Sequence, residues 1–216
     1  MTTTLKTFDA GRAVLEDYLD NSLYPARLMV SEAQSLGEAL AAGNIPAETR
    51  LLTFEHDGIL YTFPMSVVLS YNVIQGAIQE KPWMMTFCNA CNTGMVFDPV
   101  VDGQLLHFRR RGSYDGLLLI WDEETNTYWQ HITGEGLHGS SAGKQLHMIT
   151  TTRQMTAGEA IAINGGAWLL TTSLTEAQQT LSGMMEKCGH NRKRSQPELS
   201  RPSPKKINAA RVLSWV

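Results

Sequence analysis

Between residues 49 and 151 the apolar positions form the short, turn-bounded runs that are typical of strands. Residues 50–56 and 59–63 flank Asp57-Gly58, a two-residue turn in which glycine accepts the positive φ that a hairpin requires. Further strands are predicted at residues 83–87, 95–98, 104–110, 117–121, 127–131 and 145–151. Because short turns join neighbouring runs, the pattern predicts an antiparallel, hairpin-built sheet.

Apolar residues at helical spacing are found before this region and once inside it. Residues 10–19, with Asp9 as the cap, predict a first helix. A second helix is predicted from the capping-box sequence Ser31-Glu32-Ala33-Gln34 to Gly43. A short helix is predicted at residues 66–78, ending near Gly76.

Helical signals return toward the C-terminus. Capping-box sequences at Thr156 and Thr175 predict two further helices, the second reaching Cys188, with a last strand at 167–171 between them. The fold class is therefore α+β: a central antiparallel, hairpin-built sheet forms a mainly β core, and helices lie near both chain ends. The domains are a helical N-terminal extension at 1–48, the core at 49–189 and a basic, disordered tail at 190–216.

Charge is distributed unevenly along the 216 residues. Residues 190–216 carry seven Lys and Arg against the single acid Glu198, which leaves 11 basic and 20 acidic residues in 1–189. An acidic body disfavours nucleic acid as a partner, because duplex binding depends on neutralising phosphates. No apolar stretch approaches the roughly 20 residues needed to span a bilayer, and the N-terminus lacks the pattern of a secretory signal. We expect a cytoplasmic protein with reduced thiols, no membrane contact and no partner that the sequence identifies.

The most informative segment is Cys88-Asn89-Ala90-Cys91-Asn92-Thr93-Gly94, which places two thiols three residues apart on a tight turn relieved by glycine. A thioredoxin-like motif would start a helix, whereas strand-like residues follow this turn. Strand–turn–strand is closer to a metal knuckle, which supplies half of a tetrahedral site. Metal binding, a redox disulfide and simple packing all stay open, with the redox interpretation the least favoured.

The remaining ligands of such a site must come from elsewhere. His131 and His138 lie in a glycine-rich loop with Glu135 between them, a place where a carboxylate can orient a ligand or act as a base. Further candidates are His107, Cys188 and His190. For each residue alone, an ordinary loop or core position is the simpler interpretation.

Arg109-Arg110-Arg111-Gly112 follows an apolar strand. Guanidinium groups could clamp a phosphate or carboxylate. A charged edge strand that resists aggregation is the favoured interpretation. No nucleotide-binding glycine motif, nucleophile elbow or His-Glu-x-x-His segment is present.

Three blocks together resemble a bacterial and archaeal family catalogued as domain of unknown function 3179, over about residues 50–150. They are the cysteine turn with Val96-Phe97-Asp98, the segment 122–129 that begins with Asp122 and ends with Trp129, and the segment 133–146 that begins Thr133-Gly134-Glu135. The resemblance implies a compact, mainly β fold and no established activity.

The chain departs from the family pattern at two places. The family usually has His-Glu where this chain has Tyr71-Asn72, and a Gly-x-x-Gly stretch where it has Arg109–Arg111 and Gly112. If the family's His or Glu is a metal ligand, His131 or His138 must replace it, or the chain is a degenerate member. We therefore expect a zinc- or iron-binding domain with ligands Cys88, Cys91 and His131 or His138, and Glu135 in a catalytic or orienting role. The alternatives are a redox protein that cycles Cys88 and Cys91, and a non-catalytic binding module.

Overall fold

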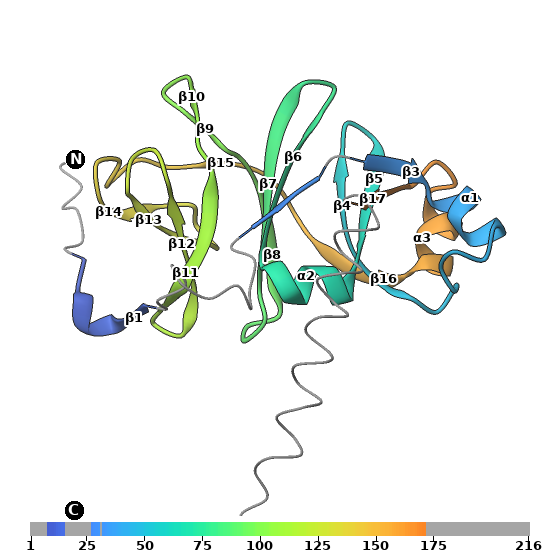
Figure 1. Cartoon of the computed structure of the whole chain (residues 1–216), viewed down its shortest axis with the longest axis horizontal. Coiled ribbons are helices and arrows are strands. Elements are labelled where there is room, and N and C mark those ends of the chain that lie inside the picture. The colour runs from blue at the N-terminus through green and yellow to red at the C-terminus, as the bar shows by residue number, and fades with distance from the viewer. Residues whose placement is uncertain (1–7, 16–26, 31, 172–216) are drawn as a thin grey trace, which may run out of the picture. The chain divides into compact units, whose positions relative to one another are not determined.

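The computed structural model describes residues 8–15, 27–30 and 32–171 (Figure 1). The chain divides into two compact units, 1–179 and 180–216, and all of the described residues belong to the first. No helix in the described part of the chain is long and apolar enough to cross a membrane. The predicted helix at 175–188 and the basic tail lie outside the described residues.

The central sheet has the order β15-β8-β7-β6-β2. Its strands are β2 (Leu28–Met29), β6 (Val73–Ile78), β7 (Lys81–Cys88), β8 (Thr93–Asp98) and β15 (His147–Thr151). Adjacent strands are antiparallel except β2 and β6, which are parallel. Trp83, Met85 and Phe87 of β7 belong to one hydrophobic cluster, and Met84 and Cys88 to another. Because side chains alternate along a strand, both faces of β7 are buried, which explains its apolar run.

The second sheet packs against the central sheet, and the hydrophobic cluster that contains Cys88 lies between them. Its order is β1-β11-β12-β13-β14, with β1 (Ala13–Leu15), β11 (Phe108–Tyr114), β12 (Leu117–Asp122), β13 (Tyr128–Gln130) and β14 (Gly136–His138). Phe108, Ile120 and Trp129 contribute to this cluster from β11, β12 and β13. A two-stranded ribbon, β9 (Val100–Val101) and β10 (Gln104–Leu105), connects β8 to β11.

The third sheet also packs against the central sheet. It contributes Leu52, Phe54 and Phe63 to the hydrophobic cluster that contains Trp83, Met85 and Phe87 of β7. Its order is β16-β4-β5-β17-β3, with β3 (Glu32–Ser35), β4 (Arg50–His56), β5 (Ile59–Pro64), β16 (Arg153–Thr156) and β17 (Trp168–Thr171). The strand β17 is parallel to β5, and the other pairs are antiparallel. In Figure 1, α1 (Leu36–Ala41) and α3 (Ala157–Ile163) lie beside these strands. The remaining helix, α2 (Met65–Tyr71), follows β5 directly along the chain.

The α+β class with a mainly β core is confirmed, as are most of the predicted hairpins. The Asp57-Gly58 turn joins β4 to β5, and both of its residues have positive φ. Thr156 caps α3 in the predicted capping box with Glu159. The β core is divided among three five-stranded sheets in the described part of the chain.

The prediction of a helix at residues 10–19 is wrong for residues 10–15, the part of this range that the structure describes. Residues Ala10–Arg12 form one 3-10 turn capped by Asp9, and the next three form β1, which pairs with β11. The second predicted helix begins later than expected, since residues 32–35 form β3 and Ser35, rather than Ser31, caps α1. The N-terminal segment therefore contributes one strand to each large sheet. The division into extension, core and tail stays a prediction.

The helix predicted at 66–78 is too long. Asn72 adopts a left-handed conformation, with φ of 59°, and ends α2 after Tyr71. Residues 73–78 then form β6, which pairs with β7 over its whole length. Because the helix ends at Asn72, the residues after it are free to form a strand of the central sheet, where Val73 and Ile74 are fully buried.

The edge-strand interpretation of Arg109–Arg111 holds for part of β11 only. In the sheet order β11 lies between β1 and β12, but β1 pairs with residues 112–114 alone, so among the described strands Arg109 and Arg110 pair on the β12 side only. A bulge between Arg110 and Gly112 interrupts its pairing with β12. Gly112 has φ of 134°, and a Cβ there would lie 2.0 Å from the carbonyl oxygen of Val14. Only glycine therefore allows β1 to pair at this position.

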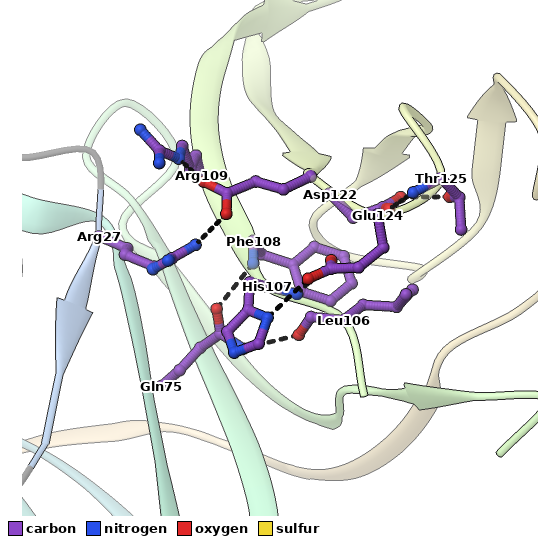
Figure 2. A network of polar contacts seen from close by, with 10 residues as sticks. Arg27, Gln75, Leu106, His107, Phe108, Arg109, Asp122, Glu124 and Thr125 are labelled. Carbon is purple, nitrogen blue, oxygen red and sulfur yellow. Dashed lines mark hydrogen bonds and ion pairs between the residues drawn. The ribbon is translucent and has the colours of Figure 1, made fainter. Parts of the chain in front are cut away.

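Gln75 of β6 connects the central and second sheets (Figure 2). Its side chain is 2 % exposed. The amide oxygen accepts from the backbone N–H of Phe108 at 2.7 Å, and the amide nitrogen donates to the carbonyl of Leu106 at 3.0 Å. One side chain thus satisfies two buried backbone groups where no neighbouring strand does so.

Replacing Gln75 by leucine should lower the free energy of unfolding by about 2–3 kcal/mol, because two buried backbone groups lose their partners. Urea denaturation at unchanged slope measures the loss. Gln104→Leu, at an exposed residue of β10, is the control and should change stability by less than about 0.5 kcal/mol. Equal effects in the two variants would contradict the assigned role of Gln75.

Candidate metal centre

The cysteine turn is the connection between β7 and β8, which are paired up to Cys88 and Thr93. The predicted strand–turn–strand arrangement is therefore correct. The residue with positive φ is Asn92, at 52°, so Asn92 rather than Gly94 relieves the turn. Gly94 has a different role, because a Cβ there would lie 2.4 Å from Oγ1 of Thr152. The turn places one thiol in the core and the other at its margin.

His131 completes a group of three potential metal ligands. It follows β13 directly and is fully buried. Its Nε2 lies 3.6 Å from Sγ of Cys91, and the ligand atoms of Cys88, Cys91 and His131 all lie within 4.8 Å of one another. The two thiols belong to the central sheet and the imidazole follows a strand of the second sheet, so the group lies where these sheets pack.

The two thiols have different environments. Cys88 is 3 % exposed, whereas Cys91 is half-buried at the edge of the hydrophobic cluster. The backbone N–H of Cys91 donates to Sγ of Cys88 at 3.4 Å. Burial raises the pKa of Cys88, but hydrogen bonds from Cys91 and from the backbone of Leu118 and Ala90 outweigh it and lower the pKa overall. Burial and the proximity of Cys88 raise the pKa of Cys91.

The His131 imidazole is neutral near pH 7, because burial lowers its pKa to about 4. A neutral ring is the form that ligates metals. Its Nδ1 is buried and has no hydrogen-bond partner among the described residues. Since Nε2 is the nitrogen nearest to Cys91, it is the candidate ligand atom, and Nδ1 would carry the proton.

The other predicted site residues lie outside this group. His138 is an exposed residue of β14 whose ring stacks on Phe8, with centroids 5.1 Å apart. Glu135 forms an isolated backbone bridge with Gln145 and is half-buried. His107 is hydrogen-bonded to Glu124, with 2.6 Å between Nδ1 of the imidazole and Oε1 of the carboxylate. Cys188 and His190 lie outside the described residues.

Sequence reasoning missed the polar residues that surround the turn. Asn72 and Asn89 are hydrogen-bonded to each other beside Cys88, and Arg110 donates to Asn72. The available signal was an asparagine inside the predicted helix, a residue type that readily takes the left-handed conformation and so ends helices. Its side-chain contacts could not be foreseen, because β11 is distant in sequence.

Chemically, two thiolates and one imidazole form a donor set that suits zinc or iron. A tetrahedral ion would need one further ligand. The described cysteines are free thiols, so the same group is also competent to form a disulfide.

A family model described as Protein of unknown function (DUF3179) matches residues 30–180. This match includes the cysteine turn and His131. No curated protein and no solved structure matches the chain.

Proposed function

Since the chain belongs to the DUF3179 family, which is described only as of unknown function, we propose from its own geometry that it is a soft-metal-binding domain. The ion would be zinc or iron, held by Cys88, Cys91 and His131. The observation that carries the proposal is that three ligand atoms of suitable chemistry from two sheets lie within 4.8 Å of one another. The imidazole is neutral and its Nε2 already faces a thiol sulfur.

The electrostatics favour metal binding over the redox alternative. A redox thiol that attacks a substrate disulfide needs a lowered pKa together with access to solvent. Here the thiol with the lowered pKa is Cys88, which is 3 % exposed, and the more accessible Cys91 has a raised pKa. A buried cysteine sulfur that accepts hydrogen bonds from backbone N–H groups is the arrangement of a metal knuckle.

A catalytic role would require a coordination position open to water or substrate. Glu135 stays our candidate for a base or a residue that orients a ligand, although its carboxylate is outside the group of three ligand residues. A cytoplasmic location and the absence of a nucleic-acid partner also stay predictions.

Purified, tag-free protein should contain about one zinc or iron per chain by elemental analysis. Cys88→Ser and His131→Gln should each lose most of the metal, because each removes a ligand from a set of three. His147→Gln is the matched control, since His147 is an exposed residue of β15, and it should keep the wild-type ratio.

A thiol count without reductant separates the alternatives. Metal-free protein with two thiols missing would indicate a Cys88–Cys91 disulfide and support the redox protein. Metal-free protein with all three thiols free would leave the turn a purely architectural feature and contradict the proposal.

A further inference from the structure

The side chain of Asn72 contacts the residues on both sides of Cys88, in addition to the pairing of β7 with β8. Asn72 follows α2, is 3 % exposed and has φ of 59°. A non-glycine residue in this conformation costs roughly 1 kcal/mol or more unless its surroundings stabilise it. Asparagine tolerates the conformation better than most residues, and its amide here is fully used.

The contacts of Asn72 lie on both sides of Cys88. Its Nδ2 donates to the carbonyl of Phe87 and to Oδ1 of Asn89, both at 2.9 Å. The backbone carbonyl of Asn72 accepts from the N–H of Phe87 at 2.8 Å. Asn89 in turn donates to the carbonyl of Leu69 in α2 at 3.4 Å. The residues before and after Cys88 are therefore both fixed to the end of α2.

The orientation of the Asn72 amide follows from the chemistry of its partners. Arg110 donates to Oδ1 of Asn72 at 2.8 Å. A guanidinium can only donate and a backbone carbonyl can only accept, so the oxygen must face Arg110 and the amino group must face Phe87. Arg110 on β11 thus determines which group of Asn72 reaches the cysteine turn.

We propose that Asn72 is a positioning residue for the metal centre, setting the direction of the Cys88 thiolate through its hydrogen bonds to Phe87 and Asn89. The inference rests on the proposed function. The direction of a side chain's Cα–Cβ bond is set by the backbone on either side of it. Asn72 holds the backbone of Phe87 before Cys88 and the side chain of Asn89 after it. Partners that orient metal ligands from outside the coordination sphere typically change metal affinity by about 10–100-fold.

Cobalt(II) is the probe, because its d–d and thiolate charge-transfer bands report ligand geometry. Asn72→Gly keeps the left-handed backbone and removes the amide, whereas Asn72→Asp keeps the size and the acceptor for Arg110 but has no donor for Phe87. Each should bind cobalt about tenfold or more weakly, with shifted d–d bands. Asn126→Gly is the matched control: Asn126 is exposed, has φ of 52° and lies in the β12–β13 turn. It should keep wild-type affinity and spectrum.

The possible results separate the two proposals. A wild-type protein that binds no cobalt would contradict the metal-binding function itself. Wild-type binding, with unchanged affinity and bands in both Asn72 variants, would overturn the positioning role alone. If Asn72→Gly does not fold, Asn72→Asp decides. Loss of cooperative unfolding in both variants would show a purely structural residue and would also overturn the inference.

Discussion

Asp122→Ala should lower the free energy of unfolding by about 4–5 kcal/mol, at the upper end for a single substitution. Asp122 ends β12 and is fully buried. Its carboxylate accepts from the backbone N–H of Thr125 at 2.5 Å, the hydroxyl of Thr125 at 2.7 Å, the N–H of Thr127 at 3.2 Å and Nε1 of Trp129 at 2.7 Å. Alanine would leave the buried N–H of Thr127 and the buried indole N–H of Trp129 without this acceptor, and the part-buried N–H of Thr125 would lose its partner as well.

Asp122→Asn provides the sharper test, because it keeps the volume and replaces one acceptor oxygen by a donor. It should cost less than alanine but still about 2–3 kcal/mol. Asp102→Asn is the control: Asp102 is 72 % exposed and forms an ion pair with Lys144, so its loss should cost less than about 1 kcal/mol. Urea denaturation measures all three. A loss below about 1 kcal/mol for Asp122→Ala would show that water replaces the carboxylate.

The effect should extend to the candidate centre. Trp129 belongs to the same hydrophobic cluster as Cys88 and precedes His131 by two residues. Freeing its indole N–H would loosen the strand from which His131 follows, so metal content should fall with stability in the Asp122 variants. The segment from Asp122 to Trp129 is one of the three blocks that resemble the family in sequence. The hydrogen bonds of the Asp122 carboxylate to Thr125, Thr127 and Trp129 give a physical reason for the residues found there.

The hairpins were predictable because local chemistry specifies them. The turn at Asp57-Gly58 has positive φ at both residues, and the sequence on either side of it consists of short, turn-bounded apolar runs that are typical of strands. The N-terminal strands were not predictable, because β1 is stabilised by pairing with β11, about 100 residues later. Ser35 caps α1 through the N–H of Glu38, and the sequence contains this Ser-x-x-Glu pattern, so the choice of Ser31 was an error of interpretation.

The candidate site was predictable only in part. Two thiols three residues apart on a hairpin are visible in the sequence, since β7 and β8 flank them directly. The choice between His131 and His138 depends on which side of β13 and β14 faces the central sheet. The bulge between Tyr128 and Trp129 changes that register. A one-residue shift moves a side chain to the opposite face, so periodicity alone could not select His131.

If the proposed ion is bound, removing it should lower the melting temperature by roughly 10 °C, the second large effect that we expect. An ion present at 1,000 times its Kd stabilises the folded state by about 4 kcal/mol. Each kcal/mol corresponds to about 2–4 °C for a domain of this size. The physical reason is that Cys88 and Cys91 come from the central sheet and His131 follows a strand of the second. The ion would therefore cross-link two sheets through ligands that the unfolded chain does not hold together.

Calorimetry with and without a chelator tests this expectation, and adding zinc back should restore the melting temperature. In Cys88→Ser the chelator should have little effect, because the ion is already absent, and its melting temperature should resemble that of chelated wild type. His147→Gln should respond as wild type does. If wild-type protein carries metal but its melting temperature is unchanged by chelation, the ion cannot be held between the sheets by these three residues, and its ligands must be sought elsewhere in the chain.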